Sequence, residues 1–502
     1  MRSNISPLRA DYLKRVSMDL AIALDSNAVS LHRQLYEELR QAILSGRLAP
    51  KERIPSTRSL SKSLGISRTT VTQSYEQLLS EGYIQTIVGS GTFVCDQLPD
   101  LMLRSTPVET QQKIARPLCQ LSKYGIGLSQ TDVSLMSEPD TAISFRYGRP
   151  AFDKFPMQLW RKLLLSHCRK GSSWLDYATD PQGHRPLREA IARYLSRSRA
   201  VQCDPDSVIM TNGSQQALYM VMRLLIDPGD AIAIEDPGYL SGRRIFLSQG
   251  AKLLPIGVDE SGLLVKDLAD TTEPIKLVYV TPSHQFPTGA ILSLPRRLEL
   301  LSWAYSTGAM IIEDDYDSEY RYGDRPIPAL QGLDKSDSVL YIGTFSKVLF
   351  PSLRIGYLVL PQNLVSIFSR AKRLSDRQLP LLEQYILTDF IEEGHLERHL
   401  RRMRSHYDQC RSVLVQALNA HFGEQATILG EKAGIHLMVR LYTSFSDEEI
   451  IHRAAKVGVG MMSAQPHYLK AHRPGEFIFG YSELTLPQIE EGISRLAEVL
   501  KY

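Results

Sequence analysis

From Ala142 to the C-terminus, short apolar runs alternate with longer segments of helical spacing, and this alternation constrains the fold more than any other feature. Parallel strands need a crossover helix between them, and a sheet of such strands is covered by helices on both faces. The sequence therefore predicts an α/β domain with a mostly parallel sheet. Its expected strands are Val208–Met210, Ala231–Ile234, Leu277–Val280, Met310–Ile312 and Val339–Ile342.

Polar residues follow three of these strands, at the ends where open α/β sheets bind ligands. The first strand leads through a glycine turn to Ser214 and Gln215 at a helix start, which suits a phosphate. The second leads to Tyr239, whose ring can stack on a flat ligand. The fourth leads to Asp314, which can keep a pyridine nitrogen protonated, and to Tyr316, which can donate to a ring hydroxyl. Each motif alone also occurs in ordinary turns, and their order makes the set specific.

One lysine completes this set. Lys347 lies close to Thr344, Ser346 and Arg354 in the stretch that runs from Gly343 to Tyr357. A lysine amine at the floor of a cleft can form a Schiff base with pyridoxal 5′-phosphate (PLP). Hydroxyls and a guanidinium can bind the phosphate dianion of that cofactor. We therefore expect PLP as the cofactor, held by Lys347.

The front of the chain has a different pattern. Residues 1–95 carry 12 Lys and Arg against 8 Asp and Glu, which favours a polyanionic partner. Helices are expected from Leu31 to Ser45, from Thr57 to Leu64 and from the N-cap Ser67 to Gly82. This layout is typical of a helix-turn-helix. The expected apolar face of the third helix consists of Val71, Tyr75, Leu78 and Leu79.

The segment after the third helix predicts a wing. Tyr83–Val88 and Thr92–Val94, joined by Gly89-Ser90-Gly91, are typical of a β-hairpin. The first turn of the third helix offers short hydroxyls and an amide for base edges and an arginine for phosphate. These side chains belong to Arg68, Thr69, Thr70 and Gln73.

This front region resembles the GntR-type winged helix. The resemblance rests on Leu44–Leu48, Ile54–Leu60, Gly65–Val71 and Gly82–Ile84, and it spans Leu31 to Val94. It implies double-stranded DNA as a partner, with the wing near the minor groove. The residues expected to contact DNA, from the resemblance and the exposed helix turn together, are Arg58, Ser67, Arg68, Thr69, Thr70, Gln73 and Gly89.

Composition and the positions of prolines set the expected domain limits. Residues 96–141 contain three prolines and polar stretches without sustained periodicity, which predicts a linker between a DNA-binding domain of residues 25–95 and a PLP-binding domain of residues 142–502. The five cysteines form no Cys-x-x-Cys pair, and no apolar run reaches the length of a membrane span. We therefore expect a cytoplasmic protein without a membrane partner.

The second part of the chain resembles fold-type I aminotransferases from about Phe145 onward. With the winged helix in front, the whole chain resembles the MocR/GabR-type transcriptional regulators. Tyr177–Gly183, Pro282–Gly289 and Glu313–Asp317 carry this second resemblance. It implies a PLP-dependent regulator that forms a homodimer, in which Tyr177 reaches the site of the neighbouring subunit.

The resemblance also implies a role for each site residue. Lys347 forms the Schiff base, Tyr239 stacks on the ring and Tyr316 contacts the ring oxygen. Asp314 binds the pyridine nitrogen, with Asp315 as its rival. The residues around the phosphate are Ser214, Gln215, Thr344, Ser346 and Arg354.

Two positions depart from the aminotransferase pattern. Phe286 replaces the asparagine that hydrogen-bonds the ring oxygen, and Ile478 replaces the arginine that clamps a substrate carboxylate. An apolar side chain cannot offer the bidentate fork that a carboxylate needs. Arg243, Arg244 and Arg473 are the alternative partners for such a group.

Taken together, the sequence predicts a regulator that senses an amine, an amino acid or PLP itself, with no enzymatic turnover expected. The alternative is an active aminotransferase with an appended DNA-binding domain. No metal site is expected. His395 and His399 do not match the His-Glu-x-x-His motif of zinc proteases, and they are interpreted as part of a solvated helix face. The effector, the operator and the sign of regulation are left open.

Overall fold

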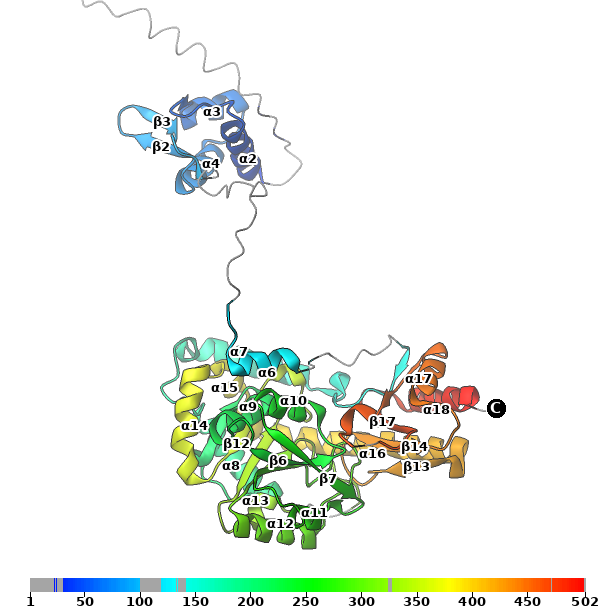
Figure 1. Cartoon of the computed structure of the whole chain (residues 1–502). Coiled ribbons are helices and arrows are strands. Elements are labelled where there is room, and N and C mark those ends of the chain that lie inside the picture. Colours follow the sequence, from blue (N-terminus) through cyan, green and yellow to red (C-terminus); the bar gives the residue numbers. More distant parts are fainter. Residues whose placement is uncertain are drawn as a thin grey trace, which may run out of the picture. The chain divides into compact units, whose positions relative to one another are not determined.

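The computed structural model describes residues 22, 24, 30–99, 119–131, 133, 141–323, 327–470 and 472–500. Contacts divide the chain into two compact units, Met1–Cys119 and Gln120–Tyr502 (Figure 1). The domain limits expected from the sequence, at residues 25–95, 96–141 and 142–502, stay a prediction. Among the described residues, no helix is long and apolar enough to cross a membrane.

The first unit is a winged helix, as the sequence predicts. Its helices are α2 (Leu31–Leu44), α3 (Thr57–Leu64) and α4 (Arg68–Ser80). Strands β2 (Ile84–Ile87) and β3 (Gly91–Val94) form the hairpin of the wing. A short strand that the sequence analysis missed, β1 (Arg53–Ile54), pairs antiparallel with β3 and completes a three-stranded sheet.

Side-chain caps mark the starts of α3 and α4, and a glycine marks the end of α3. Ser56 accepts a hydrogen bond from the N–H of Ser59, and Ser67 accepts one from the N–H of Thr70. Gly65 ends α3 in the left-handed conformation, at φ 66°. The expected apolar face of α4 is wrong at one position: Leu79 is 46% exposed, whereas the other three residues are buried. Leu79 follows Leu78 directly, and successive positions of a helix point about 100° apart, so both cannot face the same core.

The second unit is built on an eight-stranded sheet. Its strand order is β5-β12-β11-β10-β9-β6-β7-β8. The pairs from β11 across to β7 are parallel, which confirms the predicted mostly parallel sheet, whereas β12 runs antiparallel to both its neighbours. The strands span Val208–Thr211 (β5), Ala231–Asp236 (β6), Lys252–Asp259 (β7), Gly262–Leu263 (β8), Ile275–Val280 (β9), Met310–Asp315 (β10), Val339–Thr344 (β11) and Gly356–Val359 (β12).

Helices cover both faces of this sheet. Alternate residues of one strand enter different apolar cores: Leu340 and Ile342 pack into one core and Tyr341 into another. All three residues are buried, as expected for a strand with two covered faces. The helices around the sheet are α7 (Met157–Lys170), α8 (Arg185–Arg199), α9 (Gly213–Leu225), α10 (Leu240–Ser248), α11 (Val265–Ala269), α12 (Leu294–Thr307), α13 (Leu330–Leu333), α14 (Gln362–Ser375) and α15 (Leu381–Glu392).

The C-terminal part of the second unit adds a smaller antiparallel sheet. Its order is β13-β14-β17-β16, formed by Ala426–Leu429, His436–Leu441, Glu476–Gly480 and Met462–Ser463. The long helix α16 (His395–Phe422) leads into this sheet, and α17 (Asp447–Lys456) and α18 (Leu486–Leu500) pack beside it (Figure 1). A two-stranded parallel sheet joins β4 (Ile143–Ser144) to β15 (Val459–Gly460).

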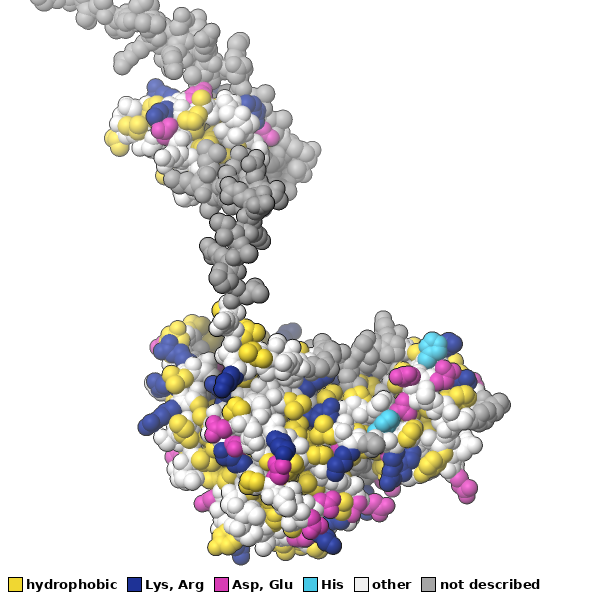
Figure 2. Space-filling view, viewed as in Figure 1, with side chains coloured by type: hydrophobic (Ala, Val, Ile, Leu, Met, Phe, Trp, Pro, Cys, Tyr) yellow, Lys and Arg dark blue, Asp and Glu magenta, His cyan; other side chains and the backbone are white. Residues whose placement is uncertain are grey.

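One helix lies inside the segment that the sequence analysis assigns to the linker. Helix α6 (Lys123–Gln130) begins at the N-cap Ser122 and packs against α10. On the face of the second unit that Figure 2 shows, Lys and Arg are interspersed with Asp and Glu. No single-sign surface covers that face, in keeping with the location of the positive excess in residues 1–95.

Candidate functional site

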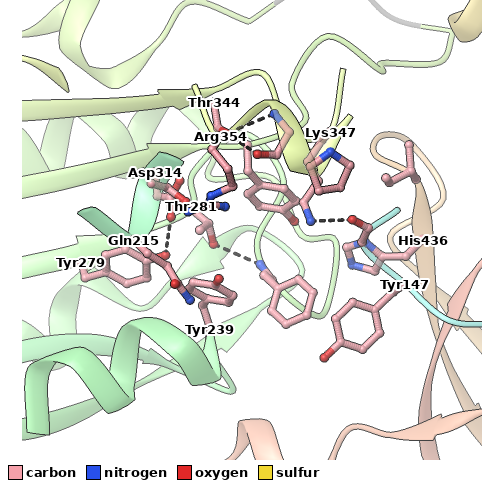
Figure 3. Close-up of a pocket in the computed structure, with 17 residues that line it drawn as sticks. Tyr147, Gln215, Tyr239, Tyr279, Thr281, Asp314, Thr344, Lys347, Arg354 and His436 are labelled. Atoms are coloured by element: carbon pink, nitrogen blue, oxygen red, sulfur yellow. Dashed lines mark hydrogen bonds between the residues drawn. The ribbon is translucent and has the colours of Figure 1, made fainter. Parts of the chain in front are cut away.

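Nine of the ten residues that the sequence analysis expects around a cofactor line one pocket of the second unit (Figure 3). They come from the carboxyl ends of β6, β10 and β11, from the start of α9 and from the loop before β12, where parallel sheets bind ligands. The lining residues are Tyr147, Gly148, Ser214, Gln215, Tyr239, Tyr279, Thr281, Phe286, Asp314, Tyr316, Thr344, Ser346, Lys347, Pro351, Arg354, Ile435 and His436.

Lys347 projects into this pocket from the loop after β11. Its Nζ donates a 2.6 Å hydrogen bond to the carbonyl oxygen of Gly148. Burial lowers the pKa of Lys347, because desolvation disfavours the ammonium, and the carboxylates of Asp317 and Asp314 oppose this shift in part. A lowered pKa increases the fraction of neutral amine, which is the form that attacks a carbonyl carbon.

Adjacent positions of β10 separate the two candidate pyridine partners. Asp314 lines the pocket, whereas Asp315 lies on the other face of the strand and pairs with Arg199 at 2.9 Å and with the Tyr341 hydroxyl at 2.6 Å. The Tyr279 hydroxyl donates to Oδ2 of Asp314. Burial raises the pKa of Asp314 to about 6, against the lowering effect of that hydrogen bond. The geometry thus favours Asp314 over its neighbour.

Asp314 also meets a test of whether the pocket fits PLP. Its Oδ1 is buried and has no hydrogen-bond partner among the described residues. A buried carboxylate oxygen without a donor is costly, and a protonated pyridine nitrogen is a donor of suitable charge. The residues present therefore fit the ring end of the cofactor.

The start of α9 and the side chain of Arg354 lie together in the pocket lining, where the sequence analysis expects a phosphate. The guanidinium of Arg354 donates to the Asn212 carbonyl oxygen at 2.7 Å and to its Oδ1 at 3.2 Å. Arg354 adopts a left-handed backbone, at φ 53°. Gly213 beside it has φ 73°, a conformation that L side chains rarely adopt, and a Cβ there would lie 2.9 Å from an Arg354 nitrogen. Helix N–H groups and a fixed guanidinium suit a dianionic phosphate.

Tyr316 is held by a buried histidine, His284. The Tyr316 hydroxyl donates to the His284 carbonyl oxygen at 2.9 Å, and His284 Nδ1 lies 3.0 Å from an Asp317 oxygen. His284, Asp317 and His436 bring ligand-type atoms within 4.8 Å of one another. The sequence analysis expects no metal, and that expectation stays a prediction.

The two departures from the aminotransferase pattern lie together. Phe286, Met438, Ala464 and Ile478 form one buried apolar cluster beside the pocket. Burial lowers the pKa of His436 well below its ordinary value, so this neighbour of the cluster is neutral at pH 7.

The three alternative arginines do not line the pocket. Arg243 donates to the carbonyl oxygens of Tyr468 and Pro466, at 3.0 and 2.8 Å. Arg473 is exposed. Within the described part of the chain, Lys347 and Arg354 are thus the only Lys or Arg side chains that line this pocket.

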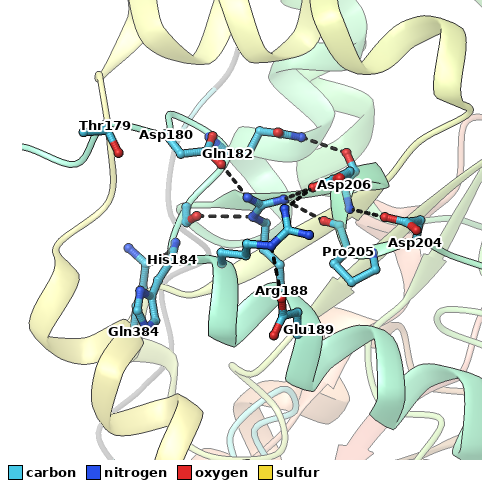
Figure 4. Close-up of polar contacts among 12 residues, drawn as sticks. Thr179, Asp180, Gln182, His184, Arg188, Glu189, Asp204, Pro205, Asp206 and Gln384 are labelled. Atoms are coloured by element: carbon cyan, nitrogen blue, oxygen red, sulfur yellow. Dashed lines mark hydrogen bonds and ion pairs between the residues drawn. The ribbon is translucent and has the colours of Figure 1, made fainter.

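Tyr177 does not line the pocket of its own chain. Its side chain is 69% exposed, and the Arg377 guanidinium lies 4.4 Å from its ring centroid. The rest of its motif is structural: Asp180 pairs with the buried Arg188 of α8, which also donates to the Pro205 carbonyl oxygen at 2.7 Å (Figure 4). The ion pair of Asp180 therefore holds the segment that contains Tyr177 against α8.

Sequence reasoning missed several lining residues. Tyr147 and Thr281 come from loops, Tyr279 comes from β9, and His436 is the first residue of β14. Tyr279 had a usable signal, because it places a polar hydroxyl next to the last residue of a mostly apolar strand. The interpretation of His399 was wrong: it is buried and donates to the Val348 carbonyl oxygen at 3.0 Å, because its side of α16 faces the core.

The residues expected on DNA lie on one winged helix. Arg58, Ser67, Arg68, Thr69, Gln73 and Gly89 are exposed, and Thr70 is half-buried. The Ser67 hydroxyl is engaged in capping, since it accepts from the Thr70 N–H and lies 2.8 Å from the Thr70 hydroxyl. Gly89 sits at the wing turn with φ 78°. The exposed set is compatible with contact to a duplex.

Comparison with known proteins agrees with both units. Residues 142–496 match the family described as aminotransferase class I and II, and residues 31–94 match the bacterial regulatory proteins of the gntR family. The structure of LysN, an α-aminoadipate aminotransferase of Thermus thermophilus complexed with N-(5′-phosphopyridoxyl)-L-leucine, is similar with 28% identity and a TM-score of 0.69. It covers 75% of this chain and 96% of its own. Fold and site thus define a winged helix joined to an aminotransferase domain.

Two curated relatives are similar to this chain over most of its length. The probable rhizopine catabolism regulatory protein MocR of Rhizobium meliloti is 39% identical over 476 residues, 95% of each chain. The pyridoxine biosynthesis transcriptional regulator PdxR of Corynebacterium glutamicum is 33% identical over 407 residues, 80% of this chain and 82% of its own. The chain belongs to the MocR-type transcriptional regulators of the gntR family.

Proposed function

We propose that the chain is a cytoplasmic transcriptional regulator that holds PLP at Lys347 and changes its DNA binding when a small amine, an amino acid or PLP alters the occupancy of that lysine. One observation carries the proposal: a winged helix shares a chain with a pocket that presents a lysine of lowered pKa between Asp314 and Arg354. An amine-reactive site in the same chain as a DNA-binding domain is suited to a regulator that senses a small molecule.

The cofactor half of this proposal has a direct test. Full-length protein is titrated with PLP while its absorbance is followed, and we expect a visible band from the Schiff base. Lys347→Ala should abolish the band. Lys372→Ala is the matched control, because Lys372 is another buried lysine but pairs with Asp376 outside the pocket. A colourless wild-type protein, or a band that survives in Lys347→Ala, contradicts the proposal.

The DNA half is tested separately. Duplexes that bind are selected from a random pool with the full-length protein, and their affinity is measured with and without PLP. We expect Arg68→Ala to weaken binding without changing the absorbance band. Loss of both properties in this variant contradicts the assignment of separate roles to the two units.

The partner subunit is part of the same proposal. We propose a homodimer in which Tyr177 of one chain reaches the pocket of the other, and its 69% exposure supports such a role. Tyr177→Phe and Lys347→Ala chains are mixed and the PLP affinity of the mixed dimer is measured. Mixed dimers that bind no better than either parent contradict the arrangement.

An active aminotransferase is the second candidate, favoured by the likeness to LysN. It predicts repeated formation of keto acid from an amino acid by PLP-loaded protein. A spectral response to an effector with no keto-acid accumulation favours the regulator.

A further inference from the structure

The pocket has two chemically different ends. Figure 3 shows Asp314, Thr344 and Arg354 on one side of Lys347, and Tyr147 and His436 on the other. The first end carries charge and hydroxyls for the cofactor. An amine that reacts at Lys347 has room for the rest of its structure only at the second end. The side chains at that end therefore determine which amines bind.

The rings of Tyr147, Phe286 and His436 line the second end, and His467 contacts Phe286 from outside the pocket lining. The ring centroids of Tyr147 and Phe286 lie 5.2 Å apart, those of Phe286 and His436 lie 5.3 Å apart, and those of Phe286 and His467 lie 5.0 Å apart. Such edge and tilted contacts form an apolar enclosure. Phe286 is common to all three contacts and also belongs to the buried cluster with Ile478.

Phe286 packs against Met438 and Ile478 on one face of the small sheet, and these two residues do not themselves line the pocket. Met438 of β14 pairs with Ile478 of β17, which pairs in turn with Met462 of β16. Directly paired residues share a face, and all three side chains are apolar. Ile478 is 0% exposed. This face therefore offers no charge at its centre.

A cation on that face is already neutralised. Arg440, two positions from Met438, forms an ion pair with Glu476 at 2.6 Å. Glu476 is 0% exposed, and it also accepts from the Tyr468 hydroxyl. Removing Arg440 from this buried carboxylate would leave Glu476 without its charge partner.

The polar atoms of the aromatic end are also engaged. The Tyr147 hydroxyl lies 3.1 Å from His467 Nε2, and His467 Nδ1 donates to the Gly238 carbonyl oxygen at 3.2 Å. His436 Nε2 donates to the Pro287 carbonyl oxygen at 3.2 Å. Burial lowers the pKa of His467 to about 4, so its ring is neutral at pH 7. An anion entering here would lose water without gaining a charged partner.

We infer that the effector is a primary amine that carries no carboxylate or other anionic group and whose remaining part is apolar or aromatic. The inference deepens the proposed function and rests on it. Exchange at Lys347 needs no oxidant or further reagent. The effector nitrogen forms the carbon–nitrogen double bond that Lys347 gives up, and its two protons move to the released lysine amine.

The test uses full-length protein loaded with PLP and matched ligands. The pairs are 3-methylbutylamine with leucine and 2-phenylethylamine with phenylalanine. The spectral change is followed at increasing ligand concentration, and each concentration is converted to that of the uncharged amine form. We expect each amine to reach half-saturation at a concentration on the order of 10- to 100-fold lower than its amino acid, because an unpaired buried carboxylate is penalised. Equal or tighter binding of the amino acids overturns the inference.

Leucinamide separates charge from size. It has nearly the volume of leucine and lacks the anion. We expect the affinity of leucinamide to be close to that of 3-methylbutylamine when both concentrations are expressed as the uncharged amine. Leucinamide as weak as leucine would mean that the pocket excludes bulk rather than charge, and the inference would be wrong.

Two variants locate the selectivity. In Ile478→Arg, the affinity for leucine should rise at least about 10-fold relative to the affinity for 3-methylbutylamine, because the new side chain supplies a guanidinium at the centre of the face. Ile478→Leu, which keeps an apolar side chain of similar volume, should retain the wild-type preference. The wild-type ligand pairs decide the question if the arginine variant does not fold. A missing Lys347-dependent band defeats the proposed function itself, whereas a band with preference for amino acids defeats only this inference.

Discussion

The Tyr279 hydroxyl donates a 2.7 Å hydrogen bond to Oδ2 of Asp314, and Oδ1 of the same carboxylate is buried without a partner in the described part of the chain. One oxygen is thus fixed by the protein, and the other is free to accept a hydrogen bond from a ligand in the pocket. This arrangement orients the carboxylate before any cofactor arrives, which lowers the entropic cost of binding. Its consequences can be measured in two ways.

The first prediction concerns cofactor affinity. Asp314→Asn replaces a charged acceptor with a neutral amide, so we expect PLP to bind on the order of 10- to 100-fold more weakly. Spectral titration of the variant measures this loss. Asp315→Asn is the matched control: it disturbs the pair with Arg199, so it should lower the thermal midpoint and leave the PLP affinity of the folded protein nearly unchanged. The reverse pattern would assign the pyridine to Asp315.

The second prediction concerns stability without cofactor. The pKa of Asp314 is raised to about 6 by burial, above the unfolded value of 3.8, so the folded chain holds this proton more tightly. Ionised Asp314 therefore costs stability above pH 6, and the cost disappears as the pH falls from 6 toward 4. PLP-free Asp314→Asn should be more stable than wild type at pH 8 by on the order of 1–3 kcal/mol. Denaturant unfolding at pH 8 and pH 4.5 measures the difference, which should shrink at the lower pH.

A group with the opposite shift is the control for this experiment. The pKa of Asp230 is lowered, chiefly by its hydrogen bond with Lys276. Its ionised form adds stability at high pH, and that gain is lost as the pH falls through the folded pKa. Asp230→Asn should thus lose a little stability at pH 8. A gain of stability in both variants would point to general charge repulsion instead of burial at Asp314.

The third prediction concerns the phosphate end. Arg354→Lys keeps the charge but loses the planar fork that Asn212 holds in place, so PLP affinity should fall by about 10-fold or more. The preference for PLP over pyridoxal, which lacks the phosphate, should narrow by a similar factor. Equilibrium titration with both ligands measures it. Arg223→Lys, a change on α9 outside the pocket, should keep the wild-type preference.

The sequence predicts most of this site because its chemistry is local. Lys347, Asp314 and Tyr239 each follow an apolar strand, and the carboxyl ends of parallel strands meet at one edge of a sheet. The caps of α3 and α4 were also predictable, because a serine N-cap and a terminal glycine act within one turn.

The remainder depends on packing between distant segments. Tyr147 and His436 enter the pocket from segments nearly 300 residues apart, and neither carries a local signal. The short strand β1 was missed because two residues give no periodicity, and only pairing with β3 makes them a strand. The burial of His399 was missed because both faces of α16 carry polar residues in sequence, and the contact with the Val348 carbonyl is tertiary.

The last prediction separates folding from DNA contact within α4. The Ser67 hydroxyl accepts from the Thr70 N–H at 3.1 Å, so Ser67→Ala should destabilise the winged helix by about 1 kcal/mol. Arg68, the next residue, is exposed at the first position of the helix. Arg68→Ala should leave thermal unfolding of the first unit unchanged and reduce the slope of log affinity against log salt by about 1, as expected for one lost phosphate contact.

Both variants are made in the full-length chain and measured by thermal unfolding and by DNA binding at several salt concentrations. Ser67→Thr keeps a capping hydroxyl and should restore most of the stability lost in Ser67→Ala. If Arg68→Ala lowered the unfolding midpoint as much as Ser67→Ala does and left the salt slope unchanged, Arg68 would have a structural role. The first turn of α4 would then stabilise the winged helix without binding phosphate.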